Sequence, residues 1–222
     1  MEAVWTVDGD DTSWTAWAEN RADASASSLV RELIAKRKAG RQEWAVDIGC
    51  GTGRAFIPLA EAGYRVIVID PTPKCIELSL RRALQSGIIA YPIQASAARL
   101  PLRTASAAFA FAFATLFHLS LVELTLALHE VRRVLRPEGE ALLHFLDIED
   151  WRRSLGQEID PDRAPVPSFQ AVVTCFCSRQ VIEEWLEEAG LGLLSPELRT
   201  SASEAGQQRN WLAQCRKSDE HS

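Results

Sequence analysis

Three glycines alternate with small residues in Gly49-Cys50-Gly51-Thr52-Gly53, and an acid, Asp47, stands two positions before the first of them. Glycine lacks a Cβ, so its backbone can take positive φ and a ligand can approach it closely. The flanking segments predict an apolar strand over 44–48 and a helix over 54–62. A helix N-terminus offers free N–H groups and partial positive charge to a carboxylate or phosphate. The pattern therefore predicts a turn that binds a nucleotide-like ligand.

The spacing of the glycines separates two kinds of nucleotide site. A dinucleotide fingerprint is G-x-G-x-x-G, whereas this turn is G-x-G-x-G. A second apolar strand is predicted over 65–70, and it ends on Asp70, 17 residues after Gly53. A carboxylate there can accept two hydroxyl hydrogen bonds at once, which suits the diol of a ribose.

His118 is the candidate general base, because it follows a predicted strand at the edge where open α/β sheets bind ligands. The ordinary pKa of histidine lies near neutrality, as a base requires. The alternative is a histidine that fills the pocket wall, and the sequence leaves both open. Asp147, after another predicted strand, could orient such a base or merely close a turn.

Alternating β and α segments must position these residues. Strands are predicted at 44–48, 65–70, 89–94, 109–115, 140–146, 191–199 and 209–216, and helices at 24–39, 54–62, 73–86 and 121–135, with one more from a Ser178 cap to Gly190. Such alternation favours a doubly wound, Rossmann-like α/β fold with helices on both faces. We expect a seven-stranded, mostly parallel sheet with an antiparallel last strand.

The composition and charge of the chain disfavour several other classes of protein. The 222 residues are 47% hydrophobic and 24% charged, which predicts a single domain over 1–222. The net charge of −6 disfavours a nucleic-acid partner, and no apolar run is long enough for a membrane span. Five scattered cysteines, and an acidic N-terminus unlike a secretion signal, predict reduced thiols and a cytoplasmic location. No metal site is expected, because Cys175 and Cys177 lack a second ligand cluster.

Three further segments follow the glycine turn and Asp70 in order: Gln94-Ala95-Ser96-Ala97-Ala98-Arg99-Leu100-Pro101-Leu102, Phe113-Ala114-Thr115-Leu116-Phe117-His118-Leu119, and Ala127 to Gly139 with its Glu130-Val131-Arg132-Arg133-Val134-Leu135-Arg136-Pro137 core. With them, about residues 12–216 resemble the class I S-adenosylmethionine-dependent methyltransferases of the small-molecule, quinone-methylating type (methyltransferase domain 11).

The resemblance implies S-adenosylmethionine as the cofactor. It assigns cofactor contacts to Asp47, Gly49, Cys50, Gly51, Gly53, Asp70, Pro71, Ser96, Ala97 and Thr115. Ser96 stands where the family usually has an aspartate that accepts a bond from the adenine amino group, and a hydroxyl accepts that bond more weakly. Two further departures lie at Ala107-Ala108 and at Glu138, which replaces a glycine.

The implied reaction is methyl transfer to a small-molecule acceptor, with an oxygen atom somewhat favoured. Methyl transfer from a sulfonium mainly needs collinear alignment, and a base only where the acceptor must lose a proton. A lid over 1–23 and an insertion over 147–175 are expected to contact substrate through Trp14, Trp17 and Trp151. The alternatives are a protein that binds the cofactor with little or no catalysis, or an NAD(P)-dependent oxidoreductase. The sequence does not predict the oligomeric state.

Overall fold

The computed structural model describes residues 3–8, 14–37, 39, 42–155, 157–159, 172–203 and 206–218. The described strands are β1 Ala3–Asp8, β2 Trp44–Ile48, β3 Arg65–Asp70, β4 Ala90–Gln94, β5 Ala107–Ala112, β6 Leu135–Asp147, β7 Gln157–Ile159, β8 Val172–Cys177, β9 Leu191–Ser203 and β10 Gly206–Lys217. The helices are α1 Trp14–Asn20, α2 Ser28–Ala35, α3 Phe56–Glu61, α4 Pro73–Ser86, α5 Leu121–Val134 and α6 Arg179–Glu188, with short 3-10 turns η1 Leu116–His118 and η2 Trp151–Leu155.

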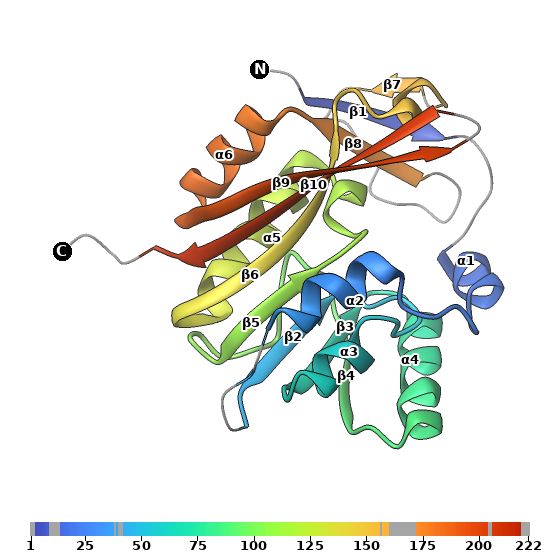
Figure 1. Cartoon of the computed structure of the whole chain (residues 1–222), viewed down its shortest axis with the longest axis vertical. Coiled ribbons are helices and arrows are strands. Elements are labelled where there is room, and N and C mark those ends of the chain that lie inside the picture. Colours follow the sequence, from blue (N-terminus) through green and yellow to red (C-terminus); the bar gives the residue numbers. More distant parts are fainter. Residues whose placement is uncertain are drawn as a thin grey trace.

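One sheet runs through the molecule in the order β4-β3-β2-β5-β6-β8-β1-β7, with β10 and then β9 paired beside β6 (Figure 1). β4, β3, β2, β5 and β6 are parallel, and β10 is antiparallel to both of its neighbours. This confirms the predicted α/β fold with a mostly parallel sheet and an antiparallel last strand.

The predicted number of seven strands is wrong, because β1, β7 and β8 extend the sheet to ten strands among the described residues. β8 pairs with β6 only at Leu146 and Asp147, where β6 ends, and β1 pairs antiparallel with both β7 and β8. These pairings join residues far apart in the chain. The N-terminal segment and the segment after β6, predicted as lid and insertion, are thus paired with each other.

Two apolar clusters cover the two faces of the sheet. Phe109 and Phe111 of β5 belong to the cluster with α2 and α3, while Ala110 and Ala112 belong to the cluster with α5 and α6. The alternation of large and small residues along β5 therefore serves two different helix layers, as expected for a central strand. Helices on both faces are confirmed (Figure 1).

Local signals fix the ends of several helices. Ser120 and Glu123 form a reciprocal capping box at the start of α5, and Ser178 caps α6 as predicted. α4 ends at Gly87, whose φ of 64° closes it in the left-handed conformation. None of the described helices is both long and apolar enough to cross a membrane.

Two element boundaries differ from the prediction for identifiable reasons. The strand predicted at 109–115 is β5 and ends at Ala112, because Ala114 turns the chain with a φ of 58°. The helix predicted at 24–39 is α2, which begins later because the Ser27 side chain caps the Val30 N–H. β6 contains the predicted 140–146 and begins earlier, at Leu135.

Candidate cofactor and active site

The glycine turn leaves β2 beside the end of β3. Gly49, Gly51 and Gly53 have φ of 68°, 52° and 75°, in the left-handed region that favours glycine. The Gly49 and Cys50 N–H groups both donate to the Ile69 carbonyl, at 2.7 and 2.9 Å. The predicted turn is therefore present, and its conformation needs the residues that the sequence supplies.

Thr115 lies directly against this turn. Its hydroxyl donates to the Gly49 carbonyl at 3.1 Å, and a Cβ on Gly49 would lie 2.1 Å from the same hydroxyl oxygen. The close approach of β2 and the exit of β5 thus depends on Gly49. Thr115 precedes η1, which carries His118, so one short loop joins the glycine turn to the candidate base.

Two buried carboxyl groups, Asp47 and Asp70, face the turn. Asp47 is 2% exposed, and within the described part of the chain its Oδ2 has no hydrogen-bond partner. Burial, reinforced by the nearby Asp70 carboxylate, raises the pKa of Asp47 to about 7. Burial also raises the pKa of Asp70, against backbone N–H groups that lower it.

Those N–H groups belong to Thr72, which donates to Asp70 Oδ1 at 2.9 Å, and to Gly51, which donates to Oδ2 at 2.9 Å. Side-chain hydrogen bonds from Thr72 and Cys75 also lower the pKa of Asp70, so a diol would bind there by replacing these two rotatable donors.

The other predicted cofactor residues lie on neighbouring loops. Pro71 is exposed directly after β3, and Thr115 lies on the glycine turn as described. Ser96 is exposed after β4, where its Oγ accepts the Ala98 N–H at 3.2 Å, while Ala97 is buried. Burial raises the pKa of the Cys50 thiol well above its ordinary value, which makes it a packing residue rather than a nucleophile.

Trp14, Trp17 and His118 come together although α1 and η1 are far apart in sequence. The Trp14 and His118 rings meet edge to face at 4.9 Å, and Trp14 and Trp17 at 6.0 Å. A Cβ on Gly51 would lie 3.2 Å from the Trp17 ring, so Trp17 covers the glycine turn. An aromatic wall therefore runs from the turn to the candidate base.

Two arginines beside this wall were not among the predicted site residues. The guanidinium carbons of Arg21 and Arg54 lie 5.6 and 5.5 Å from the centre of the Trp17 ring. Burial and the charges of Arg21 and Arg82 lower the pKa of Arg54. Neither Arg21 nor Arg54 forms an ion pair within the described residues. The guanidinium groups of Arg21, Arg54 and Arg82 thus lie near one another, and together they favour the binding of an anion.

The sequence held a signal for one of them. Arg54 lies two positions before Phe56, the first residue of α3, and a cation is unfavourable close to a helix N-terminus. A bound anion would offset that cost.

Asp147 and Trp151 lie toward β10. Asp147 accepts hydrogen bonds from Arg209 Nε at 2.8 Å and Trp211 Nε1 at 2.5 Å, which commits both carboxylate oxygens to that strand. Trp151 packs against Gly206, where a Cβ would meet its side chain at 2.7 Å. The Trp151 Nε1 is buried and has no partner among the described residues.

The chemical groups of these residues suit the groups that S-adenosylmethionine carries. Asp47 keeps a buried acceptor without a partner, which suits a ligand carrying N–H or cationic groups. Arg21 and Arg54 suit a carboxylate, and Asp70 suits a diol. In the described ranges, no group of three or more His, Cys, Asp or Glu side chains could hold a metal ion.

Comparison with known proteins gives the same class of molecule. Residues 45–139 match the family described as "Methyltransferase domain". An uncharacterized methyltransferase of Mycobacterium tuberculosis is 34% identical over 124 residues, 54% of this chain and 48% of that protein. An O-methyltransferase of Aspergillus sclerotiorum is 29% identical over 124 residues, which make up 54% of this chain and 46% of that protein. The chain spans about half the length of these curated relatives.

Among solved structures, the 1,6-didemethyltoxoflavin-N1-methyltransferase of Burkholderia thailandensis, with bound S-adenosylhomocysteine, has a TM-score of 0.66 at 17% identity. The match covers 93% of this chain and 84% of that one. At this identity the likeness concerns the fold alone.

Proposed function

We propose that the chain is a class I methyltransferase, which transfers a methyl group from S-adenosylmethionine to a small-molecule acceptor. Residues 45–139 match a methyltransferase domain, and the fold is similar to that of solved S-adenosylmethionine-dependent methyltransferases. We favour an oxygen atom of the acceptor. Two relatives named as O-methyltransferases support this choice, one from Aspergillus sclerotiorum and one of ubiquinone biosynthesis from Methylocella silvestris, which matches over 43 residues.

The residues around the glycine turn would hold the cofactor. Asp70 would accept the ribose hydroxyls, and Arg21 and Arg54 would hold the carboxylate of the amino acid end. Asp47 would accept a hydrogen bond from the amino group at the same end of the cofactor, through its Oδ2. The cofactor supplies a methyl group on a sulfonium, whose leaving group is neutral, so the protein needs no acid at sulfur. The chain's own contribution is orientation in a site from which water is excluded.

The contact of Trp14 with His118 beside the Thr115 loop is the observation that carries the proposal. It joins an aromatic surface and an imidazole to the loop that touches Gly49. An aromatic ring packed on Trp14 would direct a hydroxyl toward His118, which would take its proton as the methyl group is transferred. A planar phenolic or quinol-like acceptor is therefore proposed.

Three sequence predictions enter this proposal unchanged. The single domain over 1–222, with its N-terminal lid and 147–175 insertion, stays our proposed organisation, and residues 160–171 of the insertion lie outside the described ones. An orienting role for Asp147 and a substrate contact for Trp151 also stay predictions. The five free, buried cysteines support the cytoplasmic location.

The test combines a panel of phenols, catechols and quinols with calorimetry of S-adenosylhomocysteine. His118→Gln should lower kcat about 100-fold or more and leave the Kd of S-adenosylhomocysteine within about threefold. His129→Gln, an exposed histidine of α5, is the matched control and should keep wild-type turnover. Equal loss of binding and turnover in His118→Gln would contradict the role of His118 as a base.

A further inference from the structure

The exit of β5 holds an unfavourable backbone conformation next to the glycine turn. Ala114 has a φ of 58°, which costs an L-residue about 1 kcal/mol or more. Its N–H donates to Nδ1 of His144 on β6 at 3.1 Å. The next residue, Thr115, is thereby aimed at Gly49, with which its hydroxyl makes the bond described above. The placement of Thr115 thus depends on His144.

The hydrogen bonds of His144 define its tautomer. Since Nδ1 accepts from Ala114, the proton lies on Nε2, which donates to Oδ1 of Asn210 on β10 at 3.0 Å. His144 is 4% exposed and stacks on Phe113, with ring centres 4.3 Å apart. Burial lowers its pKa to about 4, so the ring stays neutral at physiological pH.

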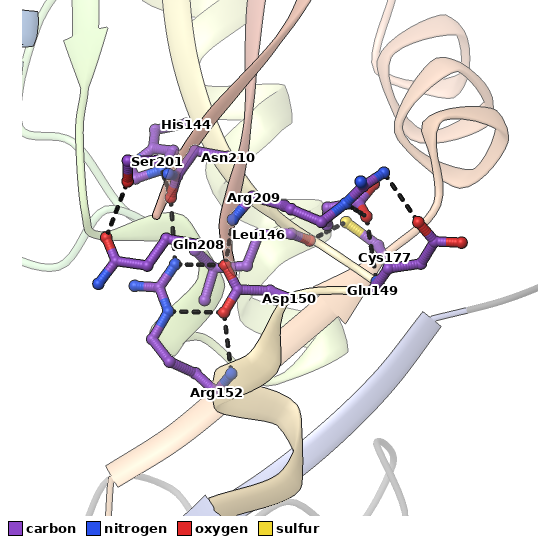
Figure 2. Close-up of polar contacts among 11 residues, drawn as sticks. His144, Leu146, Glu149, Asp150, Arg152, Cys177, Ser201, Gln208, Arg209 and Asn210 are labelled. Carbon is purple, nitrogen blue, oxygen red and sulfur yellow. Dashed lines mark hydrogen bonds and ion pairs between the residues drawn. The ribbon is translucent and has the colours of Figure 1, made fainter. Parts of the chain in front are cut away.

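Asn210 is oriented from the far side by residues of η2 and the loop before it. Figure 2 shows Arg152 reaching Asn210 and Asp150 together. Arg152 Nη2 donates to Asn210 Oδ1 at 3.2 Å and to Asp150 Oδ2 at 2.7 Å, while its Nε donates to Asp150 Oδ1 at 2.8 Å. Asp150 is 2% exposed and also accepts the Arg209 N–H at 2.6 Å.

Two donors, from His144 and Arg152, therefore converge on one oxygen of Asn210. That convergence fixes the orientation of the amide, because its NH2 group could not accept either bond. The chain of contacts runs without a gap from the segment after β6 to the β5 exit: Asp150, Arg152, Asn210, His144, Ala114.

We propose that His144 is a positioning residue for the cofactor site, and that Asn210, Arg152 and Asp150 hold it in the one tautomer that can fix the turn at Ala114. The proposal rests on the proposed methyl transfer in one respect, that the site beside Thr115 binds S-adenosylmethionine. This chain of hydrogen bonds connects the start of the 147–175 segment to the glycine turn, although the segment does not itself contact the turn through these residues.

The link predicts an effect of Asn210 on a loop that it does not touch. Replacing Asn210 by leucine removes the acceptor of the Nε2 proton, so only the Ala114 N–H still favours the Nε2–H tautomer and the Nδ1–H tautomer becomes accessible. In the Nδ1–H tautomer the ring presents a donor to the Ala114 N–H, and the turn loses its support. Aspartate at 210 keeps an oxygen acceptor and should restore the native tautomer.

The experiment measures the imidazole ¹⁵N shifts of the ligand-free protein and the Kd of S-adenosylhomocysteine by calorimetry. His144→Gln identifies the His144 signals. Wild type should show the Nε2–H tautomer, Asn210→Leu a mixture with a Kd raised about tenfold, and Asn210→Asp the wild-type tautomer with a Kd within about threefold. Arg152→Met should resemble Asn210→Leu, whereas Arg81→Met, an exposed arginine of α4, should match wild type.

The outcomes separate the two proposals. Failure of wild type to bind S-adenosylhomocysteine overturns the proposed function, while the tautomer measurement still stands. If wild type binds it and Asn210→Leu binds equally well with an unchanged Nε2–H signal, the positioning role of His144 is wrong. The melting temperature of Asn210→Leu shows whether this variant is folded. If it is not, Arg152→Met, which lies outside β10, provides the same test of the positioning role of His144.

Discussion

Replacing Asp47 by asparagine should stabilise the ligand-free protein at high pH while weakening cofactor binding. Asp47 is buried, its Oδ2 has no partner among the described residues, and its pKa is raised from 3.8 to about 7. Each pKa unit corresponds to about 1.4 kcal/mol, so ionising Asp47 in the folded protein costs roughly 4 kcal/mol above pH 7.

The sign of the pH dependence follows from the direction of the shift. A raised pKa means that the folded protein favours the neutral acid, so the cost is absent near pH 4 and grows as the pH rises to about 7. Asparagine never ionises, but it leaves a buried amide group that costs roughly 1–3 kcal/mol. The net gain in unfolding free energy expected for Asp47→Asn is about 2 kcal/mol at pH 8 and about zero or negative at pH 5.

Urea unfolding of both proteins at pH 5 and pH 8 measures this gain. Glu61→Gln, an exposed acid at the end of α3, is the control and should show no such difference between the two pH values. Calorimetry should show a Kd of S-adenosylhomocysteine raised about tenfold or more in Asp47→Asn. A stability difference that does not change with pH would refute the buried-acid reasoning, and unchanged binding would refute the cofactor role.

Three further predictions follow from single contacts. Gly49→Ala should abolish cofactor binding, because its Cβ would overlap Thr115, whereas Gly87→Ala, with a similar φ and nothing within 4 Å, should cost only about 1 kcal/mol of stability and leave binding intact. Arg54→Met should weaken S-adenosylhomocysteine binding about tenfold or more but change the affinity of methylthioadenosine, which lacks the carboxylate, by less than about threefold; equal losses would contradict the carboxylate role. Acid titration of unfolding should show that the stability of wild type relative to His144→Gln falls by about 3 kcal/mol between pH 6.5 and 4, because the lowered pKa of His144 keeps its ring neutral in the folded protein while the unfolded chain takes up a proton; a constant difference would contradict this assignment.

Local signals made much of the fold predictable. β2, β3 and α4 have the predicted bounds, because each is set by an apolar run or helix period with glycine, proline or acidic residues at its ends. The glycine turn was predictable for the same reason, since positive φ at three alternating positions can be read from residue type.

Long-range pairings were not predictable in this way. β1, β7 and β8 pair with partners distant in sequence, and no local pattern specifies such pairing. The contact of Trp14 with His118 also depends on where α1 packs. Prediction named both residues for separate reasons, and only the structure brings them together. Arg54 was missed because its place before α3 was the one signal that the sequence offered, while its closeness to Trp17 and Arg21 depends on how α1 packs.

Calorimetric titration of the wild-type protein and Asp70→Asn with S-adenosylhomocysteine and with NADH tests the central claim most directly. The account predicts that wild type binds S-adenosylhomocysteine at one site and does not bind NADH, and that Asp70→Asn weakens this binding about tenfold or more. Binding of NADH without S-adenosylhomocysteine, or S-adenosylhomocysteine binding that Asp70→Asn leaves unchanged, would contradict a methyl-donor site at the glycine turn.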